Sequence, residues 1–310
     1  METFSQKIDK ISENIIYLLS IDSKISISDL AKKMNINRRI VENRYNHLFK
    51  EHYIKYLTVS NEKTKVRFTI YIKLSKIYPE LIKKIREIPQ LIKLKEMLGS
   101  YDLSLLVEMD SQNKADKIIS RISNMLRNNI LKFDVIRHEF EDTLGYKSFC
   151  HKNEFLSGYK LLMTNRISLT KDQETVLKHI KERPNFSYSD LRKEIKMSYR
   201  KLKDIINFLV SNNIIRFSID PDYDMLGLEF HNILLKIIIS KKKEFESYLV
   251  KHPRIHWFKR SIGRWDYVLS ITAKNIAELV DIVREIRSDN QNIILEETTL
   301  ISKVNKRRKY

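Results

Sequence analysis

The pentapeptide Ser26-Ile27-Ser28-Asp29-Leu30 recurs 161 residues later as Ser187-Tyr188-Ser189-Asp190-Leu191. A second motif, Gly99-Ser100-Tyr101-Asp102, recurs after 164 residues as Gly263-Arg264-Trp265-Asp266. Such a period is far longer than the roughly 20 to 50 residues of a solenoid repeat. The chain is therefore expected to contain one two-domain unit twice, joined covalently.

Length and composition are those of a globular protein. The chain has 310 residues, of which 42% are hydrophobic, and only five Gly and five Pro. The single cysteine excludes an internal disulfide and is compatible with a reducing compartment. No apolar run reaches the roughly 18 to 20 residues that span a bilayer, and the N-terminus lacks the pattern of a secretory signal. We expect a cytoplasmic protein without a membrane partner.

The chain is strongly basic, with a net charge of +19 and a pI near 9.7. An excess of this size favours polyanionic partners, nucleic acid first among them. The excess is spread along the sequence: residues 1–64 carry +3, 65–165 carry +6, 166–225 carry +3 and 226–310 carry +7. Net charge alone is also compatible with a solvated lysine-rich surface, so the local placement of the cations has to carry the argument.

Each half begins with a pattern of three helices. A hydroxyl followed three residues later by an acid, as in Ser26-x-x-Asp29 and Ser187-x-x-Asp190, resembles a capping box. It predicts second helices over 28–34 and 188–195. Asn37 and Ser198 are good N-caps for third helices that end near residues 50 and 212, and a short strand follows each of them.

The third helix of each half has a basic outer face, which together with the following strand is typical of a winged helix-turn-helix. In that motif the third helix lies in the DNA major groove, with its first residues against the base edges. The alternative is a small helical domain that packs on another protein. The residues predicted to bind DNA are Asn37, Arg38, Arg39, Arg44, Ser198, Tyr199, Arg200, Lys201 and Lys203.

The second part of each half reads as βαββαβ. Alternating apolar residues predict strands over 66–74, 92–98, 103–109 and 130–140, then 231–239, 255–262, 267–272 and 293–302. Helical spacing predicts helices over 81–88, 115–126, 242–251 and 276–286. This order is the ferredoxin-like plan. The Gly-x-x-Asp motif falls between the second and third strands, where Gly and Asp serve a tight turn or, alternatively, a ligand.

These features together resemble the Lrp/AsnC (feast/famine) family of transcription regulators, over nearly the whole chain and twice. The resemblance is carried by residues 29–34 and 44–48 in the first half, and by 220–227 and 262–267 in the second. It implies an α+β fold with two copies of a winged helix-turn-helix domain followed by a βαββαβ ferredoxin-like (AsnC-type) domain. The expected domains are 1–62 and 63–145, a linker over 146–167, then 168–226 and 227–310.

The resemblance also implies a function. Members are sequence-specific regulators that bind double-stranded DNA as dimers or higher oligomers, and many sense an amino acid or another small effector between their ferredoxin-like domains. Here the chain would act as a homo-oligomer or as an intramolecular pseudo-dimer. The effector residues implied by the family are Gly99, Asp102, Gly263, Arg264 and Asp266. The chain departs from the family in three respects. It is a tandem fusion, its first half lacks the Asp-Pro linker, and the third helix of its second half has a weaker basic face.

Motifs for catalysis are scarce. No Cys/His cluster has the spacing of a zinc site and no glycine-rich phosphate loop is present, so we expect no metal, no cofactor and no enzyme activity. One alternative is an enzyme that resembles the siroheme decarboxylases, which occur as paired Lrp-like subunits. Its basic pocket would be formed by Arg254, His256, Lys259, Arg260 and Arg264. A protein-interaction or effector-sensing partner without DNA binding is a further alternative.

Overall fold

The computed structural model describes residues 5, 7–60, 66–109, 111–151, 159–162 and 167–303. Part of the predicted linker over 146–167 lies outside these residues. The N-terminal three-helix module contains α1 (Lys10–Ile21), α2 (Ile27–Met34) and α3 (Arg38–Lys50). Its counterpart contains α6 (Lys171–Glu182), α7 (Tyr188–Glu194) and α8 (Tyr199–Ser211). None of the helices in the described ranges is long and apolar enough to cross a membrane.

The predicted caps begin these helices. The hydroxyl oxygens of Ser26 and Ser187 accept the backbone N–H of Asp29 and Asp190 at 3.1 and 3.0 Å. Asn37 is the N-cap of α3 and Ser198 that of α8. Because each cap satisfies an N–H group that a helix leaves without an internal partner, these local signals fix where the helices start.

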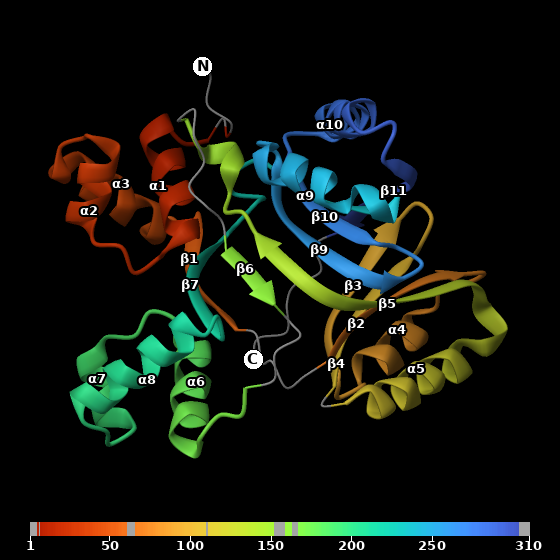
Figure 1. Cartoon of the computed structure of the whole chain (residues 1–310), viewed down its shortest axis with the longest axis horizontal. Helices are drawn as coiled ribbons and strands as arrows, with labels where there is room; N and C mark the ends of the chain where they lie inside the picture. The colour runs from red at the N-terminus through yellow and green to blue at the C-terminus, as the bar shows by residue number, and fades with distance from the viewer. Residues whose placement is uncertain are drawn as a thin grey trace.

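The two three-helix modules share one sheet. Strand β1 (Ile54–Ser60) follows α3 and pairs antiparallel with β7 (Ile215–Pro221), which follows α8. The Thr58 hydroxyl donates to the Ile180 carbonyl at 2.8 Å, and Ser218 donates to the Ser20 carbonyl at 2.9 Å. The wing strand of each module is thus completed by the other half of the chain (Figure 1).

The remaining strands form one large antiparallel sheet. The first half supplies β2 (Val66–Leu74), β3 (Leu91–Leu98), β4 (Leu103–Met109) and β5 (Ile130–Thr143). The second half supplies β8 (Glu229–Ile237), β9 (Ile255–Gly263), β10 (Tyr267–Ala273) and β11 (Ile294–Lys303). They follow the order β2-β4-β3-β11-β8-β10-β9-β5, and β5 pairs again with β2, so these eight strands close into a barrel. The short β6 (Tyr159–Leu162) pairs with the far end of β5.

The predicted fold class is therefore wrong, although the element order within each half is as expected. Two ferredoxin-like domains would each keep a separate open sheet. Each winged module would likewise keep a wing of its own. Instead the edge strands of the two halves pair, β3 with β11 and β5 with β9. Unpaired edges expose rows of backbone N–H and C=O groups, and closure satisfies them. The result is an eight-stranded antiparallel barrel with helices outside it, in place of two separate sheets.

Two helical layers cover the barrel on opposite sides (Figure 1). Helices α4 (Pro79–Arg86) and α5 (Gln112–Leu126) pack on the strands of the first half, and α9 (Lys242–Lys251) and α10 (Ile276–Asp289) on those of the second. Side chains alternate along each strand, so every second residue faces the barrel interior. A separate interior core joins both halves and consists of Tyr71, Met97, Tyr101, Ile136, Leu234, Trp265, Val268 and Leu300.

Candidate functional site

One end of the barrel carries both Gly-x-x-Asp turns and is filled by two aromatic side chains. Tyr101 and Trp265, at equivalent positions of the two turns, are fully buried. The Trp265 indole Nε1–H donates to the Tyr101 hydroxyl at 2.9 Å, and that hydroxyl donates to Asp134 at 2.5 Å. Burial and the neighbouring carboxylate raise the pKa of Tyr101. The two halves therefore meet through these rings and close this end.

The predicted effector residues shape the same turns. Asp102 accepts the Leu74 N–H at 2.8 Å, and Asp266 accepts the Ile237 N–H at 2.9 Å. Gly99 and Gly263 have φ values of 116° and 137°, a region that favours glycine. Arg264 pairs with Glu296 at 2.5 Å. The turn chemistry of these residues is thus accounted for by the fold, and their role in effector binding stays a prediction.

The opposite end of the barrel interior, hereafter the polar end, is lined by charged and polar groups. It lies where β2 starts and β4 ends, as the pairing of Arg67 with Glu108 shows. The side chains that define it are Arg67, Thr69, Lys95, Glu108, His138, Asn232 and Lys259. Each of these residues lies next to a member of one of the two cores under the helices, or two residues from a member of the interior core. Because side chains alternate along a strand, each therefore faces the barrel interior.

His138 is the buried titratable group of the polar end. Its Nε2 and the Thr69 hydroxyl are 2.7 Å apart, whereas no hydrogen-bond partner for its Nδ1 exists within the described part of the chain. Burial lowers the pKa of His138 well below 6.5, and the positive charges of Lys259 and Arg67 lower it further. In the free protein this imidazole is therefore neutral, and its Nδ1 is a buried polar atom without a hydrogen-bond partner among the described residues.

Lys95 and Lys259 occupy equivalent positions, 164 residues apart, on β3 and β9. The ammonium of Lys95 donates to Asn232 at 3.0 Å and lies 5.1 Å from the Phe230 ring. That of Lys259 lies 4.9 Å from the Trp257 ring. The side chains of Lys95, Lys259, Phe230 and Trp257 are half-buried, and that of Asn232 is buried. Two ammonium groups beside aromatic rings, with the guanidinium of Arg67 held by Glu108 at 2.5 Å, suit a flat ligand that carries carboxylates.

The five residues suggested for a tetrapyrrole pocket do not meet. Arg254 pairs with Glu278, Arg260 lies 3.4 Å from Glu139 and from Glu246, and Arg264 is at the Gly-x-x-Asp end. His256 is fully buried, with its Nε2 2.5 Å from the Thr272 hydroxyl, and burial lowers its pKa to about 3. Arg254 precedes β9 and Arg264 follows it, and Lys259 is the member whose charge acts on His138.

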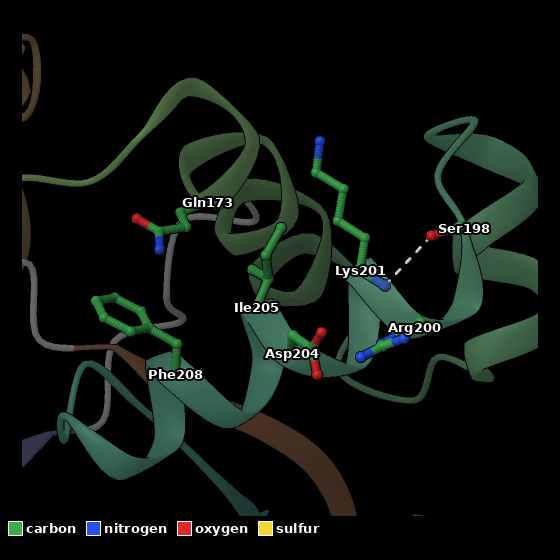
Figure 2. A pocket seen from close by; sticks show the side chains of 7 residues that line it. All are labelled: Gln173, Ser198, Arg200, Lys201, Asp204, Ile205 and Phe208. Carbon is green, nitrogen blue, oxygen red and sulfur yellow. Dashed lines mark hydrogen bonds between the residues drawn. The ribbon is translucent and has the colours of Figure 1, made fainter.

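The residues predicted to bind DNA lie where the helical pattern placed them. In α3, Arg38 and Arg39 are exposed, whereas Arg44 pairs with Asp9 at 2.6 Å. In α8, Lys201 pairs with Asp172 at 2.5 Å. Figure 2 shows Asp204 next to Arg200 in an open pocket between α6 and α8, with the Ser198 cap at its end. The second module thus offers a more neutral face, and DNA contacts by either module stay a prediction.

Sequence reasoning missed most of the polar end. The pair Lys95 and Lys259 carried a usable signal, because their spacing equals that of the Gly-x-x-Asp turns. His138, Thr69 and Arg67 carried none, since a single histidine in a strand is more often a packed core residue. Their assembly depends on β5 pairing with β2 on one side and β9 on the other.

Solved structures similar to this chain include two that match over 95% of it. No family model and no curated sequence matches the chain. Among solved structures, the siroheme decarboxylase NirDL matches at 12% identity and a TM-score of 0.58, covering 95% of this chain and 91% of that one. The structure of NirDL in complex with an iron-uroporphyrin III analogue gives the same values.

Lrp/AsnC regulators are also among the similar structures, over a smaller part of the chain. B. subtilis LrpC matches at 20% identity and a TM-score of 0.38, covering 45% of this chain and 97% of that one. An AsnC-family regulator from Agrobacterium tumefaciens matches at 20% identity and a TM-score of 0.35, covering 42% and 89%. The resemblance to these regulators is therefore partial, and tandem duplication of such a regulator stays a hypothesis.

The expectation that the protein is not an enzyme is overturned, because the fold that spans 95% of the chain is one that a decarboxylase uses. At 12% identity the match defines the fold, and the chemistry has to come from the residues of the polar end. In the ranges that the structure describes, no group of three or more His, Cys, Asp or Glu could hold a metal ion.

Proposed function

We propose that the protein binds a polycarboxylated tetrapyrrole at the polar end of the barrel and removes CO2 from one of its acetate side chains. The observation that carries this proposal is His138, buried between Lys259 and Arg67 with a ring nitrogen free of any partner among the described residues. The full-length fold match to a siroheme decarboxylase is in keeping with it.

Binding would use the cations and rings of the polar end. A tetrapyrrole such as siroheme presents a flat aromatic face and carboxylates along its edge. Lys95 and Lys259 would hold carboxylates from two strands that face each other across the barrel, and Phe230 and Trp257, whose ring centroids are 6.3 Å apart, would contact the ring system. Lys95 and Lys259 supply two positive charges for the carboxylates, which a neutral pocket would lack, whereas Arg67 is already paired with Glu108.

Decarboxylation needs a proton at the carbon that loses CO2. The bond between the methylene and carboxylate carbons breaks, CO2 leaves, and a proton takes its place, so that the acetate becomes a methyl group. A bound carboxylate offsets the repulsion that Lys259 and Arg67 exert on His138, and so raises the pKa of the imidazole. His138 then takes up a proton when substrate arrives and delivers it from Nδ1 to the methylene carbon.

The test measures binding and turnover separately. Purified protein is titrated with iron-uroporphyrin III, read as a shift of the Soret band, and then incubated with siroheme while products are followed by mass spectrometry. We expect His138→Gln to bind the porphyrin but to produce no species lighter by CO2. Lys95→Met with Lys259→Met should weaken binding more than tenfold, since each charge-assisted contact is worth about 1.5–3 kcal/mol.

A matched control is Lys243→Met on the outer surface of α9, where the side chain is exposed. It should leave both readouts unchanged. The proposal fails if wild-type protein shows no Soret shift, or if it binds the porphyrin and His138→Gln turns siroheme over at the wild-type rate.

A second candidate function is DNA binding by α3. Arg38 and Arg39 are exposed at the start of this helix, and neither has an ion-pair partner within 4.0 Å in the part of the chain that the structure describes. That is the place from which a helix in the major groove reads bases. We expect Arg38→Ala with Arg39→Ala to abolish sequence-selective retention of genomic fragments. The matched pair Arg200→Ala and Lys203→Ala on α8 should have a smaller effect, and equal effects would contradict the assignment to α3.

A further inference from the structure

The two helical layers of the barrel differ in charge, although they are equivalent in the fold. Helices α4 and α5 together contain six basic and two acidic residues, a net charge of +4. Helices α9 and α10 contain five basic and six acidic residues, a net charge of −1. Since both layers perform the same packing task, covering a sheet of four strands, the excess on α4 and α5 is not required by the fold.

Four of the six cations on α4 and α5 have no ion-pair partner among the described residues, whereas Arg86 pairs with Glu96 at 3.3 Å. Lys83, Lys84, Lys117 and Arg121 are exposed, and none has a carboxylate within 4.0 Å among the residues that the structure describes. On α10 of the other layer, Arg284 pairs with Asp281 at 3.8 Å and Arg287 with Glu297 at 3.5 Å. We call the surface formed by Lys83, Lys84, Lys117 and Arg121 the basic face.

The basic face carries an internal cost. Lys117 and Arg121 are one turn apart on α5, and like charges at this spacing destabilise an isolated helix. A merely solvated helix surface gains by alternating its charges, as α10 does. An uncompensated stripe of cations therefore indicates a partner that supplies the negative charge.

The character of that partner follows from what the basic face lacks. Protein interfaces are anchored by buried aromatic or apolar side chains, and the exposed positions of α5 carry none, being Lys, Arg, Asn, Gln, Ser and Asp. Long cationic side chains without apolar anchors are typical of contacts to phosphates. From Lys117 to Arg121 the helix rises about 6 Å, a length over which a duplex presents about three to four phosphates.

We propose that the basic face binds the phosphate backbone of double-stranded nucleic acid without regard to sequence. This surface is distinct from α3, because α4 and α5 lie at the opposite end of the molecule from the N-terminal three-helix module (Figure 1). It is also distinct from the polar end, since it lies outside the barrel. The contact requires neither tetrapyrrole binding nor reading of bases by α3.

The test uses the full-length chain with Arg38→Gln and Arg39→Gln as background, so that α3 does not contribute. Binding to a short labelled duplex of arbitrary sequence is followed by fluorescence anisotropy between about 50 and 200 mM salt. Lys83→Gln, Lys84→Gln, Lys117→Gln and Arg121→Gln are then combined in this background. The control combines Lys242→Gln, Lys243→Gln, Lys251→Gln and Arg284→Gln, which removes the same charge from the other layer.

We expect the background protein to bind with a steep salt dependence. Neutralising the basic face should reduce the slope of log affinity against log salt by about three to four, because each phosphate contact contributes about 0.9. The control should change the slope by less than one. Equal effects of the two sets would overturn the proposal, since binding would then follow net charge alone. Binding of poly-glutamate in preference to the duplex would overturn it as well, and circular dichroism confirms that each variant is folded.

Discussion

Acidification is expected to destabilise the protein through a buried histidine that the fold keeps neutral. His256 is fully buried, its Nε2 beside the Thr272 hydroxyl, and burial lowers its pKa from 6.5 to about 3. In the unfolded chain the same imidazole titrates near its ordinary value of about 6.5. Between these two values the unfolded state binds one more proton than the folded state, so the free energy of unfolding rises with pH.

The size of the effect follows from this window. At pH 7 the imidazole is mostly deprotonated in both states, although roughly a quarter of it is still protonated in the unfolded chain, and at pH 5 only the unfolded state carries the proton. Each pH unit below 6.5 changes the free energy of unfolding by about 1.4 kcal/mol, so going from pH 7 to pH 5 costs about 2 kcal/mol through His256. His252 adds to the loss in the same direction, because burial and the charge of Lys147 lower its pKa to about 4.

The assay is urea unfolding of wild type and His256→Gln at pH 7 and pH 5, followed by tryptophan fluorescence. Any constant cost of the substitution cancels, because the measured quantity is the difference between the two pH values within each protein. Wild type should lose about 2 kcal/mol more than the variant on acidification. If both proteins lose the same free energy, His256 is not neutral in the folded state and the reasoning is refuted.

Two further predictions concern the Gly-x-x-Asp end. Tyr101→Phe leaves the buried Trp265 Nε1–H without its acceptor and Asp134 without its donor, so thermal unfolding should show a loss of about 1–3 kcal/mol; an unchanged melting temperature would contradict the closed end. Gly263→Ala would place a Cβ far inside van der Waals contact of the Val135 carbonyl at a φ of 137°, whereas Gly99→Ala meets the Thr299 carbonyl at 3.4 Å. The first variant should therefore be the less stable of the two in urea, and the reverse order would argue against this register between β5 and β9.

Local signals in the sequence predicted most helices and strands to within a few residues. The strand over 103–109 and the helix over 242–251 coincide with β4 and α9. Hydrophobic periodicity and helix caps depend on only a few neighbouring residues, so the sequence of each element contains the information that defines it. The barrel was not predicted, because its closure depends on pairings such as Ile301 with Leu98, which no local pattern encodes.

The candidate site is harder to predict for the same reason. The sequence groups Lys259 with basic residues close to it along the chain as a possible tetrapyrrole pocket. In the structure its charge instead acts on His138 of β5, at the polar end. Neighbouring residues on a strand point to opposite faces. A cluster of basic residues that is continuous in sequence is therefore divided between two environments, and the site draws its members from strands of both halves.

The strand pairings that join the two halves of the barrel also affect how the chain folds. Strands β3 and β11 pair across about two hundred residues of sequence, and β5 pairs with β9 more than a hundred residues later. Contacts between residues so far apart in the sequence form slowly. During synthesis the first half is complete long before its partner strands exist, and it presents the apolar, unpaired edges of β3 and β5 to its surroundings. The interval between synthesis of the two halves is thus the period in which aggregation or chaperone binding competes with folding.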